Sequence, residues 1–222
     1  MNNLIVFDHP YGIQASENEP HNRSFCAALC KALRHSLQVN GDTVDVIDLH
    51  ADGFNPVMSA EELVQWRSGI PMNNQVADYQ RRFMEADRVI FIFPLWWMLM
   101  PAMTKGFIDK VYAKNILYQQ ETSTSGQQDR SKSAQNNQQQ QQQGKTLSGM
   151  RTFVPDCEIV MMTVMGVPSL LYKLVFGQPV VKAIQKGLCW KTGIKKFRWI
   201  PYSGVDKMTP QQRKKLLDEV HL

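Results

Sequence analysis

Residues 88–112 read RVIFIFPLWWMLMPAMTKGFIDKVY, and the arrangement of the rest of the chain follows from this segment. Its first part, Arg88 to Phe93, is an apolar run typical of a parallel strand that is buried on both faces. Pro94 ends the predicted strand, and a loop with two tryptophans follows. Pro101 suits the first turn of a helix, where its missing N–H breaks no hydrogen bond. The segment therefore predicts a strand, an aromatic loop and a helix in succession.

The same alternation of strand-like and helix-like segments runs along the whole chain. Ser24 and Thr209 are of the residue types that cap helices, and Pro210 suits a first helical position. Strands that alternate with helices predict a doubly wound α/β fold, here a parallel sheet of five strands with helices on both faces. Ligands of such sheets bind beyond the carboxyl ends of the strands. We expect strands at 4–7, 43–47, 88–93, 158–163 and 197–201, and helices at 24–38, 60–67, 75–85, 101–112, 168–188 in part and 209–220.

Length and charge limit what the chain can be. A chain of 222 residues fits a single domain, 1–222, with a sizeable core. The longest apolar run, around Val89 to Met103, is broken by two prolines, so we expect no membrane insertion. The N-terminus enters a strand at once, which argues against a signal peptide and for a cytoplasmic location. The net charge of +5 is expected to form a solvated basic surface; attraction of an anionic dinucleotide is the alternative, and nucleic acid is little favoured.

One segment does not belong to the predicted fold. Residues 119–144 read QQETSTSGQQDRSKSAQNNQQQQQQG, with no aromatic or large aliphatic side chain. Such a composition cannot bury enough apolar surface to offset the entropy of ordering the chain. We therefore predict a disordered glutamine-rich insertion within one domain, with a glutamine-mediated interaction role as the alternative.

Motifs of hydrolytic or metal chemistry do not occur in the sequence. There is no GxSxG, HExxH or P-loop pattern, and the histidines are not grouped with the spacing of metal ligands, so we expect no metal site. The cysteines form no CxxC pair and are expected to be buried thiols. Few catalytic side chains beside an aromatic-lined crevice indicate that a bound cofactor carries the chemistry. The cysteines are Cys26, Cys30, Cys157 and Cys189.

Four blocks of sequence make the chain recognisable. The blocks are His9-Pro10 with Ser24-Phe25, DLHADGFNPVMS at 48–59, PLWW at 94–97 with Pro101-Ala102 and Lys105-Gly106, and TVMG at 163–166. The second is close to D-L-x-A-x-x-F-N-P-x-x-S, and the third matches P-L-x-W-x-x-x-P-A-x-x-K-G. In these blocks the chain resembles the NAD(P)H:quinone oxidoreductase family, flavoproteins with a flavodoxin-like fold. The resemblance runs from Leu4 to about Val220, outside the glutamine-rich insertion.

The resemblance implies a flavin site at the carboxyl ends of the strands. The phosphate would meet the start of the helix at Ser24, where free N–H groups and the helix dipole favour an anion, with His9 as a further donor. The loop from Pro94 to Met98 would run along the flavin ring, with Trp97 as an apolar wall, and 163–166 would meet its pyrimidine side. The cofactor-binding candidates are His9, Ser24, Phe25, Pro94, Leu95, Trp96, Trp97, Met98, Thr163, Val164, Met165 and Gly166.

Some of these residues have plainer alternatives. Ser24 can be a simple helix cap and His9 a loop histidine bonded to backbone. Both indoles can be core residues, and 163–166 can be an ordinary turn after a strand.

The sequence also departs from the family pattern. The loop between His9 and Ser24 is longer than usual, and Met165 replaces a glycine that lets backbone approach the ring. Tyr172 lies near the place of a tyrosine that assists hydride transfer in animal members, and it is our candidate catalytic residue. The histidine that accompanies that tyrosine has no counterpart, because no histidine follows Tyr172 before His221.

The resemblance implies a flavin-dependent oxidoreductase that passes two electrons from NADPH or NADH to a quinone or a similar flat acceptor, acting as a homodimer. FAD is the first expectation for the cofactor and FMN the alternative. A regulatory subunit that binds flavin or nucleotide and modulates a partner, such as a potassium-efflux system, is the second hypothesis; it would bind nucleotide with negligible turnover. A member that has lost its flavin is the third.

Overall fold

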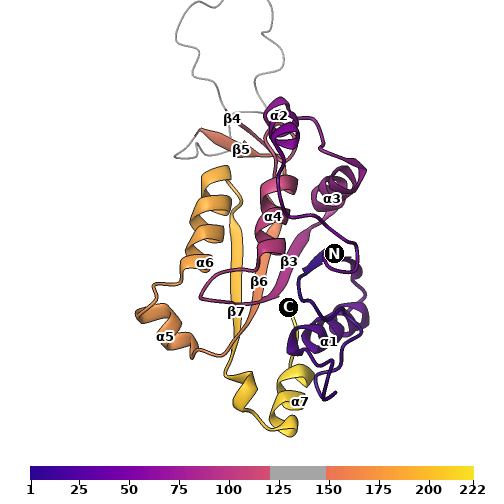
Figure 1. Cartoon of the computed structure of the whole chain (residues 1–222), viewed down its shortest axis with the longest axis vertical. Coiled ribbons are helices and arrows are strands. Elements are labelled where there is room, and N and C mark those ends of the chain that lie inside the picture. The colour runs from indigo at the N-terminus through magenta and orange to yellow at the C-terminus, as the bar shows by residue number, and fades with distance from the viewer. Residues whose placement is uncertain (121–148) are drawn as a thin grey trace, which may run out of the picture.

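The computed structural model describes residues 1–120 and 149–222, and its centre is a five-stranded sheet with every neighbouring pair parallel (Figure 1). The strand order is β2-β1-β3-β6-β7, so the winding reverses direction between β1 and β3. This is the order of flavodoxin-like folds, and it confirms the predicted fold. The strands are β1 (Asn2–Phe7), β2 (Thr43–Asp48), β3 (Arg88–Pro94), β6 (Glu158–Met165) and β7 (Lys196–Ser203).

Helices cover both faces of the sheet, as predicted. One face packs on α1 (Phe25–Val39) and α7 (Pro210–Asp218). The other packs on α3 (Asn74–Glu85), α4 (Ala102–Val111), α6 (Pro179–Lys182) and the π-helix η1 (Ala183–Trp190). The remaining short helices are α2 (Ala60–Ser68), α5 (Ser169–Leu174) and the 3₁₀ turn η2 (Val205–Lys207).

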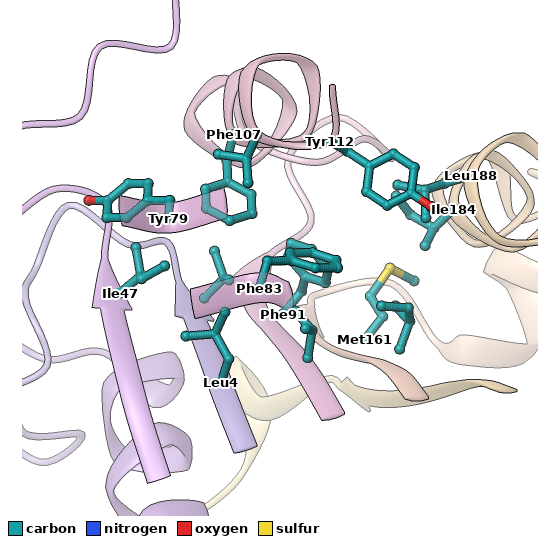
Figure 2. Packing of buried hydrophobic residues seen from close by; sticks show 14 of the residues in the cluster. Leu4, Ile47, Tyr79, Phe83, Phe91, Phe107, Tyr112, Met161, Ile184 and Leu188 are labelled. Atoms are coloured by element: carbon teal, nitrogen blue, oxygen red, sulfur yellow. The ribbon is translucent and has the colours of Figure 1, made fainter. Parts of the chain in front are cut away.

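The two faces carry two separate hydrophobic cores. Because successive strand residues point to opposite faces, Leu4 and Val6 join one core while Ile5 and Phe7 join the other. The first core is the more aromatic: Phe107 of α4 lies 5.8 Å from Tyr79 and 6.0 Å from Phe91, measured between ring centroids (Figure 2). This core fixes α4, and with it the loop that precedes α4, over β3.

A close contact explains two of the recognised sequence blocks. A Cβ atom added to Gly106 on α4 would stand 2.4 Å from the Cα atom of Pro56, far inside contact distance. Only glycine therefore lets α4 lie against the FNP segment that follows β2. The second and third sequence blocks meet at this point.

Three features differ from the sequence-based prediction. A small antiparallel pair, β4 (Tyr118–Gln120) with β5 (Met150–Thr152), was not expected. Because Gln119 and Gln120 lie in β4, the glutamine-rich segment predicted from residue 119 cannot begin before residue 121. Its part at 121–144 lies outside the described residues. Finally, three strands are longer than predicted: β6 and β7 end two residues later, at Met165 and Ser203, and β1 begins two residues earlier, at Asn2.

Candidate functional site

The predicted site residues gather at one edge of the sheet. The register aligns Phe7 of β1 with Ile92 of β3, and Pro94 of β3 with Val164 of β6, so the three strands end together. His9, the loop after residue 94 and Gly166 follow directly from these ends. The edge also lies at the reversal between β1 and β3, where ligands of doubly wound sheets bind.

The start of α1 has the geometry of an anion site. Ser24 caps the helix with extended backbone, and its Oγ accepts a hydrogen bond from the Ala27 N–H at 3.2 Å. A hydroxyl that accepts this bond can still donate its own hydrogen. Phe25, the first helical residue, is buried with its ring 5.8 Å from Tyr202. The free N–H groups of a first helical turn favour a phosphate, so Ser24 is both a helix cap and a fit for the predicted role.

His9 is held as a neutral donor. Its Nδ1 accepts the backbone N–H of Tyr11 at 3.0 Å, and the rings of His9 and Tyr11 lie 5.4 Å apart. Burial lowers the pKa of His9 below its usual 6.5, partly opposed by the nearby Asp8 charge. Because Nδ1 is an acceptor, the neutral ring carries its proton on Nε2. His9 can therefore donate a hydrogen bond to an anion without being charged itself.

The aromatic loop is a tight turn. Trp96 and Leu99 exchange both backbone hydrogen bonds, at 3.1 and 3.0 Å, and Leu95 N–H donates to the Val164 carbonyl at 2.8 Å. The two central residues have positive φ, +51° at Trp97 and +66° at Met98. That conformation suits a hairpin turn but is unfavourable for residues with side chains.

Neither indole of this loop is in the core. Trp97 is 95% exposed and Trp96 47% exposed. The alternative in which both tryptophans are core residues is therefore wrong. The strained turn presents the Trp97 ring to solvent at the carboxyl edge of the sheet, and strain of this kind collects at functional sites.

Tyr172, the candidate catalytic residue, is fully buried behind the loop. Its hydroxyl donates to the Met98 carbonyl at 3.2 Å and accepts the Val180 N–H at 3.3 Å. Burial also raises its pKa. With these backbone contacts the hydroxyl supports the aromatic loop, and the geometry gives a role in proton transfer no support.

The end of β6 is more buried than the sequence suggested. Thr163 is fully buried, and its Oγ1 accepts the Trp199 Nε1–H at 2.9 Å. Met165 lies in the aromatic-rich core, so its side chain fills the interior rather than the open edge. At Gly166 an added Cβ would meet no atom within 4 Å. The effect of Met165 on the approach of a flavin ring stays a prediction.

Sequence reasoning missed a cluster of polar residues at the same edge. Asp8, the residue after β1, is fully buried and its carboxylate contacts Thr104 and His50. Asp48, the last residue of β2, accepts the N–H groups of Ile13 and Ala51. Their positions in the sequence could have identified them, because Asp8 and Asp48 stand at the carboxyl ends of two neighbouring predicted strands.

The long loop between His9 and Ser24 is fastened at several points. Ile13 N–H bonds to Asp48, the Gln14 carbonyl accepts from Lys31 Nζ at 3.1 Å, and Ala15 is buried. Glu17 forms an ion pair with Arg213 of α7, with both side chains 11% exposed. Residues 13–17 of this loop are therefore held against β2, α1 and α7, whereas residues 18–23 are exposed.

Several hollows lie away from this edge. One of about 530 Å³ is at the opposite ends of the strands, next to Asp87, Glu158 and Lys196. Another of about 170 Å³ lies between Trp66, Tyr112 and Leu188. Across residues 1–120 and 149–222, no group of three or more His, Cys, Asp or Glu side chains is placed to hold a metal ion. No helix in these ranges has the length and hydropathy needed to cross a membrane.

Comparison with known proteins supports the fold at family level. The sequence matches the family model described as flavodoxin-like fold over residues 1–221. A Haemophilus influenzae protein named as an uncharacterized NAD(P)H oxidoreductase is 34% identical over 125 residues, which is 56% of this chain and 57% of that protein. Mouse ribosyldihydronicotinamide dehydrogenase [quinone] is 31% identical over 135 residues, covering 52% of each. The chain thus spans about half the length of the curated relatives it matches.

Solved structures show the same architecture over nearly the whole chain. A Streptococcus mutans structure, Smu.1420, has 25% identity and a TM-score of 0.71, covering 98% of this chain and 95% of that one. An FMN-dependent NADH-azoreductase from Bacillus anthracis has 13% identity and a TM-score of 0.66, covering 98% and 96%. The second likeness is one of fold alone.

Proposed function

Because this chain belongs to the family with the flavodoxin-like fold, whose model matches residues 1–221, we propose that it is a flavin-dependent NAD(P)H oxidoreductase. The observation that carries the proposal is the convergence of the α1 N-terminus, neutral His9 and exposed Trp97 at the carboxyl edge of the sheet. Curated relatives are named as NAD(P)H oxidoreductases and quinone dehydrogenases, and these names favour an enzyme over the regulatory subunit. The proposed acceptor is a quinone or another flat electrophile.

Different residues of the proposed site would contact the phosphate and the ring of the cofactor. A flavin bound here would supply the redox chemistry between NAD(P)H and the acceptor. Ser24 and the first turn of α1 would hold its phosphate, and His9 would add a donor from Nε2. The loop from Pro94 to Met98 would orient the ring, and Trp97 would exclude water from one side of it.

Two flavins are candidates for the same edge of the sheet. FAD is the first expectation from the sequence, and the azoreductase and other neighbours described with FMN make FMN an equal candidate. Both share the flavin phosphate that the α1 N-terminus would bind, so the described residues favour neither. The mass of the cofactor released from purified protein distinguishes the two.

The absorption spectrum of the purified protein tests the proposal. We expect a yellow protein, or one that turns yellow with added flavin, and a rise in the unfolding temperature at saturating cofactor. NADPH or NADH should bleach the flavin absorbance, and a quinone should restore it. A colourless protein whose unfolding temperature moves with neither FAD nor FMN would end the oxidoreductase hypothesis.

We also propose a homodimer with the site near its interface. The Tyr172 hydroxyl links α5 to the aromatic loop through its hydrogen bond to the Met98 carbonyl. The apolar side chains of α5 and of this loop are solvent-exposed in the single chain. Light scattering should give twice the chain mass, and Leu174→Asp should give a monomer. A wild-type protein with the mass of one chain would contradict the dimer. The exposed apolar residues are Trp97, Leu99, Leu170, Leu174, Val175 and Phe176.

A further inference from the structure

Asp8 occupies the point where the winding of the sheet reverses. It follows β1 directly, and its N–H extends the pairing of β1 with β3 by donating to the Ile92 carbonyl at 3.0 Å. Its side chain is fully buried, which is rare for a carboxylate because removal from water is costly. Such a group persists only where its oxygens are well bonded.

Both carboxylate oxygens of Asp8 have partners from distant parts of the chain. Oδ2 accepts the backbone N–H of Thr104 at 2.7 Å and the Thr104 hydroxyl at 2.6 Å. Oδ1 lies 3.0 Å from Nε2 of His50, which follows β2. One side chain thus joins the end of β1 to α4 and to the turn after β2.

The contact with Thr104 supplies what α4 lacks. The residue in the capping position of α4 is Pro101, which has no side-chain group to accept a hydrogen bond. Thr104 is the third helical residue, and its N–H is one of the groups that a cap normally satisfies. Asp8, 96 residues earlier in the chain than Thr104, therefore caps α4 at the end where the helix dipole also favours its negative charge.

This cap connects the two ends of the proposed flavin site. His9 is the next residue after Asp8, while Thr104 follows the aromatic loop by one helical turn. We propose that Asp8 is a positioning residue that sets the distance between the phosphate end of the site, at His9 and Ser24, and the ring end, at 94–98. This role rests on the proposed function, and it requires no contact between Asp8 and the flavin.

The expected effects separate positioning from simple stability. Asp8→Asn keeps the shape and one acceptor oxygen but loses the charge and weakens the Thr104 bonds. Amide hydrogens between 95 and 104 should then exchange at least tenfold faster in the protein without flavin. Flavin should bind about tenfold more weakly, with altered visible circular dichroism of its ring. Thr104→Val should change exchange and flavin affinity less than Asp8→Asn does. Thr104→Ser keeps the hydroxyl and should behave like wild type.

A matched control removes a carboxylate elsewhere. Asp45 on β2 bonds to Arg82 at 2.7 and 2.8 Å, outside the proposed flavin site. Asp45→Asn should leave exchange at 95–104 and flavin affinity at wild-type values.

The outcomes are distinct. Faster exchange at 95–104 in Asp8→Asn and Thr104→Val, with Thr104→Ser unchanged, supports the role of Asp8. Wild-type exchange in Asp8→Asn, or an equal effect in Asp45→Asn, overturns it. If Asp8→Asn does not fold, amide exchange at 95–104 is compared between Thr104→Val and Thr104→Ser. Faster exchange in Thr104→Val alone supports the role of Asp8, and equal exchange in the two variants overturns it. A wild-type protein that binds no flavin removes the proposed function, while exchange in the flavin-free protein still tests the cap.

Discussion

Trp97 combines full exposure with an unfavourable backbone conformation. A left-handed conformation costs a residue with a side chain roughly 1–2 kcal/mol. Glycine avoids this cost, but its larger loss of conformational entropy on folding offsets about 0.5–1 kcal/mol of the gain. Because the 95% exposed ring of Trp97 has almost no packing to lose, Trp97→Gly should stabilise the flavin-free protein by about 0.5–1 kcal/mol. The unfolding temperature should rise by roughly 2 °C. Trp97→Ala is the control, since it removes the ring but keeps the strain and should bring no such gain.

The ring of Trp97 and the hydroxyl of Ser24 should act at different steps. Trp97→Ala removes the apolar wall and should slow hydride transfer, about tenfold for each 1.4 kcal/mol lost. Ser24→Ala should weaken flavin affinity while turnover at saturating flavin is mostly retained, because a phosphate contact is the same before and after reduction. Stopped-flow reduction by NADPH at saturating flavin compares the two. Equal reduction rates in wild type and Trp97→Ala would remove that indole from the site.

The neutral state of His9 makes stability depend on pH. Its folded-state pKa lies below 6.5, so between these two values the unfolded chain binds a proton that the folded chain does not. The free energy of unfolding should therefore fall as pH drops below 6.5. Glu17 acts in the opposite direction at lower pH, because burial raises its folded-state pKa. The difference between wild type and His9→Gln in urea unfolding at pH 7.5 and 5.5 isolates His9; an equal loss in both proteins would contradict the prediction.

Single positions were predictable where a local rule applied. Ser24 precedes an apolar helical face, and Trp97 follows a strand and a proline, so both could be placed from their neighbours. The Asp8 cap on Thr104 could not be found this way, because the two residues meet only when β1 and α4 are packed. The hydroxyl partners of Tyr172 and its buried position were hidden for the same reason.

At the scale of elements, the packing of α4 depends on one glycine. The methyl group of an alanine in place of Gly106 would stand 2.4 Å from backbone and ring atoms of Pro56, which cannot rotate away. Gly106→Ala should therefore destabilise the fold by about 1–3 kcal/mol, the usual range for overpacking. Gly187→Ala is a matched control, because an added Cβ there meets no atom within 4 Å, and it should be neutral or stabilising by up to about 1 kcal/mol. Urea midpoints measure both; a Gly106→Ala midpoint equal to wild type would contradict the close contact.

Long elements with one strong periodicity were predicted well, and short ones were not. The apolar run of β3 and the capped helices α1 and α7 could be read from sequence within a residue or two. The pair β4 and β5 has three residues in each strand, too few for a pattern, and its partners are separated by the glutamine-rich segment. The π-helix η1 was predicted only as helix, because a π turn has no sequence pattern of its own.

At the scale of the whole molecule, the alternation of strands and helices predicts a doubly wound sheet. The reversal of the strand order in such a sheet then predicts the edge at which a ligand binds. The chain reverses its winding between β1 and β3, and the recognised blocks lie after these two strands, after β2 and after β6. The fold class, and the edge of the sheet at which the candidate residues gather, were therefore predictable together. The assignment of a binding or catalytic role to each residue was not, since it requires the bound cofactor.

The last prediction concerns the glutamine-rich segment and the closure of the chain around it. Gln120 of β4 pairs with Met150 of β5, so the segment between them starts and ends at neighbouring positions. Gly149 already has φ of +63°, as the second central residue of a two-residue hairpin turn requires. Replacing 121–148 with one asparagine would create a turn of asparagine and Gly149 between the paired strands.

A shorter loop costs less entropy to close, by about 0.6 kcal/mol for each halving of its length. The shortened protein should therefore fold with unchanged or higher stability, and its flavin content should equal that of wild type. Chemical unfolding and the flavin-to-protein absorbance ratio measure both. A second variant, with the same 121–148 segment replaced by a Gly/Ser linker of equal length, shows whether any effect comes from composition or from length. Loss of soluble protein or of flavin in both variants would mean that the segment contributes to the fold, and that the single-domain description of the chain is wrong.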